Sequence, residues 1–200
     1  MTVFYRILIH MKSDPWLEKW MDLLREKSAG GLLLELGCGS GWDTAELVSA
    51  GANVIAADIA RHKLPECAQA APGAGILQLN LADPLPFSNH SMAVIIASLS
   101  LHYFSWENTM LIEAELRRCI QSGGILLARF NSTHDFHHGA ASTEEIEPGF
   151  YQVGVRTKRF FDEASVKKFL HGWQIQFLEE NVIQRYRNRK YVWEAMAVCR

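Results

Sequence analysis

The sequence lacks the patterns that mark disulfide-linked, membrane-spanning and secreted proteins. Its four cysteines are widely separated, and no two have CxxC spacing. We therefore expect reduced thiols and a cytoplasmic protein. No stretch approaches the ~20 apolar residues of a membrane helix. The N-terminus MTVFYRILIHMKSDPW has neither a long apolar core nor a small-residue cleavage site, so we expect no signal peptide and no membrane association.

A basic excess is missing as well. The chain has 20 Lys and Arg against 22 Asp and Glu, a formal net charge of −2. Because basic stripes dominate nucleic-acid binders, we expect no nucleic-acid partner. The composition, 48% hydrophobic and 21% charged over 200 residues, is typical of one globular domain with a sizeable core. We expect a monomer or a homodimer.

Apolar runs and helical patterns alternate along the first two thirds of the chain. Because each strand-length apolar run precedes a helix-like stretch, the pattern predicts β-α-β crossovers and a parallel sheet. The expected strands are GLLLELG, ANVIAADIA, GILQLN, MAVIIASLSL and GILLARF, and the expected helices are DPWLEKWMDLLREK, WDTAELVSAG, RHKLPECAQAAPG, which Pro65 interrupts, and WENTMLIEAELRRCIQSGG.

The alternation breaks at about residue 131. Residues 131–160 are polar and without periodicity, so we expect a long loop that forms an active-site lid. DEASVKKFLHG then resumes as a helix with Asp162 at its N-cap, and WQIQFLEENVIQRY and YVWEAMAVC form an antiparallel hairpin at the sheet edge. With a helical segment at 1–30, the chain is predicted to be a single α/β domain, residues 1–200. Its fold is a Rossmann-like, doubly wound, seven-stranded and mostly parallel sheet with helices on both faces.

Three glycines follow the first expected strand, at alternate positions in ELGCGSGWDT. Gly37, Gly39 and Gly41 permit positive φ and let another group approach where a Cβ would clash. Such a turn lies at the carboxyl edge of a parallel sheet, where open α/β sheets bind ligands. The next helix directs free N–H groups to the same place. We therefore expect a close, partly anionic ligand here.

Two common glycine motifs do not fit this turn. A dinucleotide fingerprint GxGxxG would need its third glycine where Trp42 stands, and no GK[ST] of a phosphate-binding loop follows. Asp58 ends the second expected strand about 20 residues after the turn, where a carboxylate accepts both ribose hydroxyls. The turn and Asp58 together indicate adenosine without a required pyrophosphate.

Several segments, in order, resemble the class I S-adenosylmethionine-dependent methyltransferases. The resemblance covers residues 30–130 well and the whole chain in outline. It implies S-adenosylmethionine as cofactor and S-adenosylhomocysteine as product. It also argues against a dehydrogenase, which has no reason to carry these segments. They are ELGCGSGWDT (35–44), AADIA with Asp58, NLADPLPF (80–87), ASLSLHYF (97–104) and the helix leading to SGGILLARF (122–130).

The resemblance implies how the glycine turn would serve the cofactor. The main chain of Gly37, Cys38 and Gly39, in the turn that Gly41 completes, would pass along the methionine part. Glu35 would brace the loop through hydrogen bonds. From the residues alone, Glu35 contacting the cofactor directly is an open alternative, and Cys38 is a small residue that fits between two glycines.

The resemblance also assigns the adenosine part. Asp58 would hold the ribose hydroxyls, and Ile59 would pack on the adenine. Where the family usually has Asp to receive the adenine amino group, this chain has Asn80, followed by Leu81. Asn80 still accepts through its amide oxygen, and Asp83 is an alternative for the same role. Asn80 as an ordinary turn residue is the competing interpretation.

The end of the fourth expected strand would lie next to the reacting methyl. Ser98 would present its carbonyl near the cofactor's ammonium group. His102 and Tyr103 are the candidate catalytic residues, because a histidine at this position could take a proton near neutral pH. Alternatively, LHYF packs under the cofactor. Methyl transfer from a sulfonium needs alignment and exclusion of water, so a dedicated base is optional.

The expected lid supplies the candidate acceptor-binding residues, because it lies on the carboxyl side of the sheet. The basic stretch VRTKRFF would suit a small anionic acceptor, although its charges equally suit a solvated surface. The three histidines fit no standard zinc spacing, and we expect no metal. The candidates are His134, His137, His138, Tyr151 and Lys158.

The sequence therefore predicts methyl transfer from S-adenosylmethionine to a small-molecule acceptor. One alternative is a catalytically inactive module or partner subunit that kept the cofactor pocket. Another is an aminopropyl transferase, which usually has an acidic pair for its polyamine where this chain has LSLHYFS.

Overall fold

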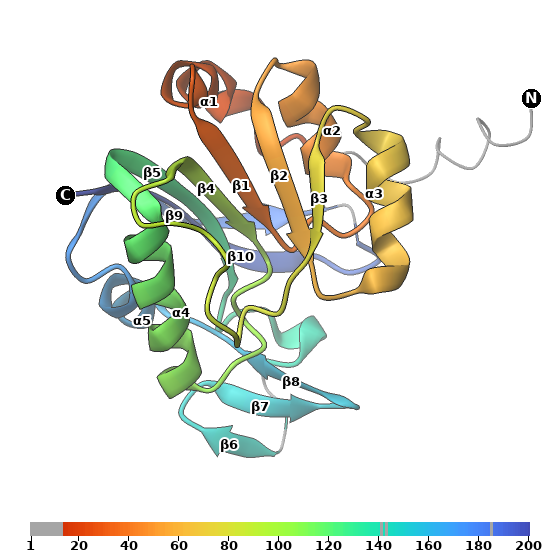
Figure 1. Ribbon diagram of the computed structural model, residues 1–200. Coiled ribbons are helices and arrows are strands. Elements are labelled where there is room, and N and C mark those ends of the chain that lie inside the picture. The colour runs from red at the N-terminus through yellow and green to blue at the C-terminus, as the bar shows by residue number, and fades with distance from the viewer. Residues whose placement is uncertain (1–13, 141, 143, 185) are drawn as a thin grey trace, which may run out of the picture.

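A seven-stranded sheet forms the centre of the molecule, with helices on both faces (Figure 1). The structure is a computed structural model that describes residues 14–140, 142, 144–184 and 186–200. The strands of the sheet are β1 (Leu32–Leu36), β2 (Asn53–Asp58), β3 (Gly75–Gln78), β4 (Met92–Ser98), β5 (Ile120–Asn131), β9 (Trp173–Ile183) and β10 (Lys190–Cys199). The helices are α1 (Met21–Ser28), α2 (Trp42–Ser49), α3 (Leu64–Ala70), α4 (Trp106–Cys119) and α5 (Glu163–Phe169).

The sheet has the order β3-β2-β1-β4-β5-β10-β9. Strands β1 to β5 pair in parallel, which confirms the doubly wound, mostly parallel fold. The final hairpin is antiparallel and lies at the edge, as predicted. Its second strand, β10, returns between β5 and β9 and is antiparallel to both.

Each face of the sheet buries its own core, because the central strands are apolar on both sides. Helices α1, α2 and α3 cover one face with Leu24, Leu47 and Cys67. Helices α4 and α5 cover the other face, where Ile112 and Phe169 belong to the core. This two-sided cover is what the strand-helix alternation predicted.

The described part of the N-terminal segment crosses the first of these faces. The expected helical segment 1–30 falls partly outside the described residues, since it includes 1–13. From residue 14 onward the chain forms the short helix η3 (Glu18–Trp20) and then α1. Asp14 pairs with the buried guanidinium of Arg129 on β5, with 2.7 Å between oxygen and nitrogen.

Two helix starts show how local sequence sets the boundaries. Pro65 was expected to interrupt a helix, but it lies in the first turn of α3, where its missing N–H costs nothing. A separate turn, η4 (Arg61–Lys63), precedes it. Asp162 caps α5 as predicted, since its carboxylate accepts the Ser165 N–H at 2.8 Å in a capping box. Within the described residues, no helix is long and apolar enough to cross a membrane.

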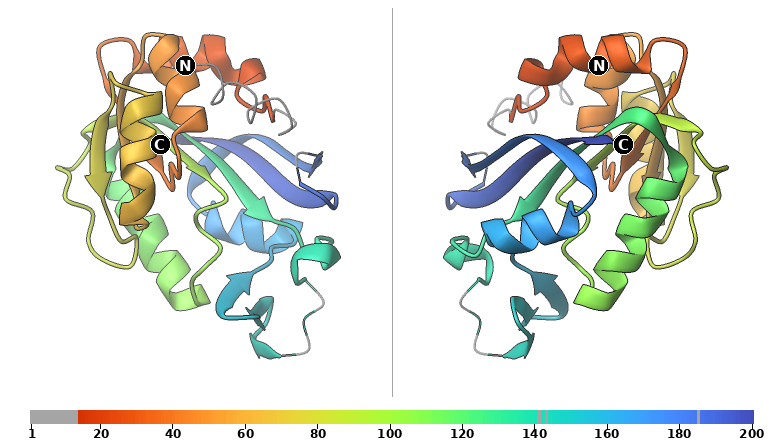
Figure 2. Two further views of the ribbon diagram at one scale, coloured as in Figure 1. Left: turned by 90° about the vertical axis from the view of Figure 1, so that its right-hand side faces the viewer. Right: turned by 90° about the vertical axis from the view of Figure 1, so that its left-hand side faces the viewer.

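The segment 131–160 is more regular than the long loop expected from its polar sequence. After the turn η5 (Phe136–His138) it forms a second, antiparallel sheet of β6 (Glu145–Glu147), β7 (Phe150–Val153) and β8 (Arg156–Arg159). Figure 2 shows this small sheet at the end of the molecule away from α1. The excursion leaves and rejoins the main sheet at one place, because the Phe161 N–H donates to the Asn131 carbonyl at 2.7 Å.

Candidate functional site

A pocket of about 510 Å³ lies at the carboxyl ends of β1, β2 and β4. One wall comes from the glycine turn, the end of β2 and the residues after β3. A second wall comes from the loop after β4 and from β8 of the small sheet. The lining residues on which the following argument depends are Gly37, Asp58, Ile59, Asn80, Leu81, Ser100, Tyr103 and Arg156.

The glycine turn is shaped first by the chain's own packing. All three glycines have positive φ, 81° at Gly37, 55° at Gly39 and 84° at Gly41. A Cβ on Gly37 would lie 2.6 Å from the Cβ of Ser100, and one on Gly41 would lie 2.8 Å from Cys67. A Cβ on Gly39 would meet no protein atom within 4 Å. Gly37 and Gly41 are therefore required by the packing of the protein itself. The close approach of a ligand to Gly39 stays a prediction, because Gly39 is not among the residues that line the pocket.

Asp58 ties the turn to the end of β2. Its carboxylate accepts the Gly39 N–H at 2.8 Å and the Ala60 N–H at 2.7 Å, one on each oxygen. The Ala57 carbonyl accepts the Gly37 N–H at 2.7 Å. The turn is therefore held in shape by its neighbours on β2. Asp58 also lines the pocket, so its remaining lone pairs face the space where a ribose was predicted.

Glu35 lies outside the pocket, buried between β1 and α2. Its carboxyl group accepts the Thr44 hydroxyl at 2.5 Å, and burial raises its pKa to about 8. The contact braces α2 against β1. Cys38 also lies outside the pocket lining. Burial and the neighbouring Cys67 raise the pKa of the Cys38 thiol, so this thiol is poorly ionised at neutral pH.

The predicted adenine contacts lie together on one wall of the pocket. Ile59 is 62% exposed, although it is apolar, and Leu81 lies on the same wall. Asn80 also lines the pocket, while its Oδ1 accepts the Ala82 N–H at 3.1 Å. Asn80 is therefore a turn residue that also lines the pocket. This position is compatible with both interpretations of the sequence, an ordinary turn residue and a contact with adenine.

The chain turns sharply after β4, so Ser98 does not line the pocket. Its hydroxyl accepts two hydrogen bonds, of 2.9 and 2.7 Å, from the guanidinium of Arg129. Leu99 then has φ of 55°, a strained value for a residue other than glycine. This turn brings Ser100 into the pocket instead. The role predicted for the Ser98 carbonyl stays a prediction.

The two candidate catalytic residues have different positions. Tyr103 lines the pocket, and burial raises the pKa of its phenol despite a hydrogen bond with Arg156. His102 is buried behind it and is absent from the pocket lining. Burial lowers the His102 pKa well below its usual range, and the charges of Lys190 and Lys158 add to this. His102 is therefore a neutral imidazole at physiological pH.

Part of the predicted acceptor group belongs to a buried polar cluster at the start of β10. The carboxylate of Asp135, which is fully buried, lies 2.8 Å from the Lys190 ammonium and 2.7 Å from His138 Nδ1. Lys158 donates to the His138 carbonyl at 3.2 Å. His138 and Lys158 are thus brought together, but neither lines the pocket, and their predicted role in acceptor binding stays a prediction.

The other predicted acceptor residues lie elsewhere. His134 faces Glu180 on β9 at 2.8 Å. Tyr151 lines a second pocket, of about 480 Å³, against α4 and α5. His137 lies in η5 and lines neither pocket. Among the described residues, no group of three or more His, Cys, Asp or Glu side chains is arranged to hold a metal.

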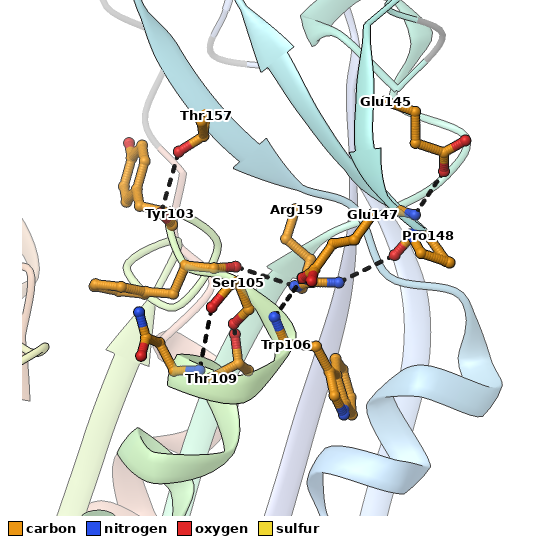
Figure 3. A network of polar contacts seen from close by, with 12 residues as sticks. Tyr103, Ser105, Trp106, Thr109, Glu145, Glu147, Pro148, Thr157 and Arg159 are labelled. Carbon is orange, nitrogen blue, oxygen red and sulfur yellow. Dashed lines mark hydrogen bonds and ion pairs between the residues drawn. The ribbon is translucent and has the colours of Figure 1, made fainter.

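A polar network fastens the small sheet to the loop after β4 (Figure 3). The Arg159 guanidinium contacts the Glu147 carboxylate and donates to the Pro148 carbonyl at 3.2 Å. Glu147 also accepts the main-chain N–H of Trp106. The Arg159 N–H donates to the His102 carbonyl at 2.7 Å. The wall that carries Tyr103 is therefore positioned by the small sheet.

Sequence analysis missed several residues at the site. Ser100, Phe104 and Arg156 line the pocket but were not chosen as site residues. Asn131, at the carboxyl end of β5, is fully buried with neither amide atom hydrogen-bonded. Asn131 does not line the pocket, although a polar residue that directly ends a buried parallel strand is one that the sequence can single out.

The comparison with protein families agrees with this geometry. A family model described as a methyltransferase domain matches residues 34–128, which include the glycine turn, Asp58 and the loop after β4. The chain carries a class I S-adenosylmethionine-dependent methyltransferase domain. The cofactor of this methyltransferase domain is S-adenosylmethionine.

Individual proteins and solved structures also resemble this methyltransferase domain. The biotin biosynthesis bifunctional protein BioHC of Cellvibrio japonicus is 36% identical over 161 residues, which are 78% of this chain. The chain spans only 30% of that relative's length. A methyltransferase structure from Methanosarcina mazei superposes with a TM-score of 0.72 at 18% identity, covering 84% of this chain and 92% of that one.

A further structure is the 1,6-didemethyltoxoflavin-N1-methyltransferase of Burkholderia thailandensis, determined with that compound and S-adenosylhomocysteine bound. It matches with a TM-score of 0.65 at 18% identity, over 93% of this chain and 81% of that chain. At this level of identity the two structures establish that the methyltransferase fold is shared.

The pocket of this methyltransferase domain fits its cofactor. The turn leaves the side of Gly39 open, Asp58 faces the pocket, and Ile59 and Leu81 form an apolar surface for a planar ring. Ser100 adds a buried hydroxyl that has no hydrogen-bond partner and lines the same space. Asp58 suits the ribose, and Ile59 and Leu81 suit the adenine.

Proposed function

We propose that this protein transfers the methyl group of S-adenosylmethionine to a small-molecule acceptor. The observation that carries the proposal is the two-walled pocket at the carboxyl edge of the sheet. The cofactor residues line one wall, and Tyr103 and Arg156 line the other. An acceptor held against the second wall would face the cofactor, which is the alignment that methyl transfer requires.

The bound cofactor would supply an activated methyl group on a sulfonium. The chain's own part is to hold the acceptor in line and to exclude water. Tyr103, with its raised pKa, is a neutral phenol that donates a hydrogen bond, and buried His102 is a weak base. Neither would strongly deprotonate an acceptor at neutral pH. We therefore propose an acceptor that is already nucleophilic when it binds, with Tyr103 orienting it and His102 supporting Tyr103.

The test is release of S-adenosylhomocysteine when the protein is incubated with S-adenosylmethionine and a mixture of bacterial metabolites. We expect product above the acceptor-free background and a methylated compound identifiable by mass spectrometry. A Tyr103→Phe variant should lower kcat more than it changes cofactor affinity. Tight cofactor binding without turnover on any fraction would favour the alternative, an inactive cofactor-binding module or partner subunit.

A role in biotin biosynthesis is a second candidate, favoured by the identity with the relative named for that pathway. Because the chain spans 30% of that protein, the role is a proposal about this part of it alone. The test is growth without biotin of a bacterial host from which the equivalent methyltransferase segment has been deleted. Growth restored by the wild type, but not by Asp58→Ala, would support it, and no growth with either would exclude it.

The cysteines support a cytoplasmic location. All four thiols are buried and none forms a disulfide, as is typical of a reducing compartment. If the protein is secreted and keeps its full stability after long exposure to oxidant without reductant, this result would argue against the cytoplasmic location.

A further inference from the structure

Strand β8, which contributes Arg156 to the pocket, carries a second cation on the same face. Side chains alternate along a strand, so Arg156 and Lys158 point to one side and Thr157 points to the other. Arg156 lines the pocket together with Tyr103. Lys158 is partly buried, and burial and nearby positive charge lower its pKa. Placing two like charges side by side costs free energy unless an anion lies between or beside them.

The carboxylates close to this wall already have other partners. Asp135 holds Lys190 and His138 at 2.8 and 2.7 Å. Both oxygens of Asp58 accept main-chain N–H groups, at 2.8 and 2.7 Å. Among the described residues, neither Arg156 nor Lys158 is within 4.0 Å of a carboxylate in an ion pair. This side of the pocket therefore carries net positive charge.

One buried polar atom without a partner lies at the pocket itself. The Ser100 hydroxyl is buried, has no hydrogen-bond partner among the described residues and lines the pocket with Arg156. A buried hydroxyl that is left unsatisfied is destabilising. It therefore indicates a position that a polar ligand completes.

We propose that Arg156 of β8 and the Ser100 hydroxyl, with the nearby positive charge of Lys158, form a subsite that selects a methyl acceptor bearing a carboxylate. The planar guanidinium of Arg156 matches a carboxylate through two parallel N–H donors. Lys158 adds a second positive charge. This inference rests on the proposed function, because it names the class of acceptor for the same pocket.

The experiment starts with calorimetric titration of S-adenosylhomocysteine, which tests the cofactor pocket alone. With that product at saturation, ligand-observed NMR then measures binding of benzoate, succinate and hexanoate. Each is compared with its neutral amide, and phenyl phosphate serves as a non-carboxylate anion. We expect at least one carboxylate to bind about tenfold or more tightly than its amide and than phenyl phosphate.

The variants are Arg156→Gln, Arg156→Lys and Lys158→Gln, with Arg25→Gln as matched control, because Arg25 is exposed on α1 and pairs only locally with Asp22. Arg156→Gln should weaken carboxylate binding by about tenfold, and Arg156→Lys should recover part of it. Affinity for S-adenosylhomocysteine and thermal unfolding should stay unchanged. A merely structural Arg156 would alter unfolding instead.

Two outcomes would overturn the inference while leaving the proposed function intact. One is binding of S-adenosylhomocysteine with no preference for any carboxylate over its amide or over phenyl phosphate. The other is a carboxylate preference that survives both Arg156→Gln and Lys158→Gln. Failure to bind S-adenosylhomocysteine would instead count against the proposed function, and the carboxylate titrations would then be repeated without it to judge the subsite by itself.

Discussion

The two walls of the pocket are built on opposite principles. On the cofactor wall, the N–H groups of Gly37 and Gly39 and the carboxylate of Asp58 already have partners within the chain. On the acceptor wall, the buried hydroxyl of Ser100 has none. Polar groups that already have hydrogen-bond partners need no rearrangement to receive a ligand. Polar groups without partners gain the most free energy when a ligand binds. The difference suggests a rigid cofactor cradle beside a wall whose hydrogen bonds the acceptor completes.

The largest expected effect on stability comes from breaking a buried ion pair near the acceptor wall, compared with breaking an exposed ion pair near the cofactor wall. Lys190→Met would leave the buried Asp135 carboxylate without its ammonium partner, at a cost of about 3–5 kcal/mol in the free energy of unfolding. Lys63→Met, on the cofactor side, removes an exposed pair with Glu66 and should change stability far less, because solvent screens an exposed ion pair. Urea denaturation measures both, and equal losses would contradict the comparison.

The next effect tests whether the cofactor wall is rigid. Gly41→Ala would place a Cβ 2.8 Å from the main chain of Cys67 at φ of 84°, so we expect about 2–4 kcal/mol of destabilisation. Gly39→Ala would point into open space and should cost only about 1 kcal/mol for its backbone conformation. However, Gly39→Ala should weaken S-adenosylmethionine binding more than its small loss of stability implies. Thermal unfolding and calorimetry on both variants check this.

The stability of the protein should depend on pH because of Glu35, which is buried next to the glycine turn. Glu35 has a folded-state pKa of about 8 against 4.5 ordinarily, so the folded state binds the extra proton between these values. The free energy of unfolding should then fall as pH rises from 5.5 to 8, by about 1–3 kcal/mol in total and at most about 1.4 kcal/mol per pH unit.

The matched variant for this prediction is Glu35→Gln, which keeps an acceptor for the Thr44 hydroxyl and cannot ionise. Its stability should vary less over the same range and exceed that of the wild type near pH 8. Chemical denaturation at several pH values measures the slope. Parallel curves for the two proteins would show that Glu35 ionises normally.

The smallest effect concerns cofactor affinity. Asp58→Ala should weaken S-adenosylmethionine binding by at least about 1.4 kcal/mol, a factor of ten, because it removes the predicted ribose contact and two N–H acceptors. Asp22→Ala, an exposed carboxylate on α1, is the control in calorimetry. Equal affinity in Asp58→Ala and the wild type would mean that the ribose lies elsewhere.

The cofactor wall could be predicted from sequence because its residues lie in short local patterns. A buried strand, a glycine turn and a strand-ending acid are adjacent in sequence, and the parallel sheet brings them together. Gly37, Asp58, Ile59, Asn80 and Leu81 accordingly line one pocket. The strands and helices of the main sheet were predicted for the same reason, since each has a clear apolar period.

The acceptor wall could not be predicted in the same way. Strands β6 to β8 have only three or four residues each, EIE, FYQV and RTKR, which is too short for a clear apolar period. These strands are defined by pairing with each other. Leu99 has a positive φ, and the turn there places Ser100 rather than Ser98 at the pocket. The sequence does not signal this turn, because no glycine stands at that position. Arg156 reaches the pocket only because the small sheet folds back on the loop after β4.

The closeness of Asn131 and Phe161 has a consequence for how this fold diversifies. Since the main chain leaves and re-enters the large sheet at hydrogen-bonded neighbours, the intervening stretch closes on itself and adds little strain to the framework whatever its length. New acceptor preferences could thus arise by exchanging one self-contained cassette, while the half that holds the methyl donor is inherited unaltered.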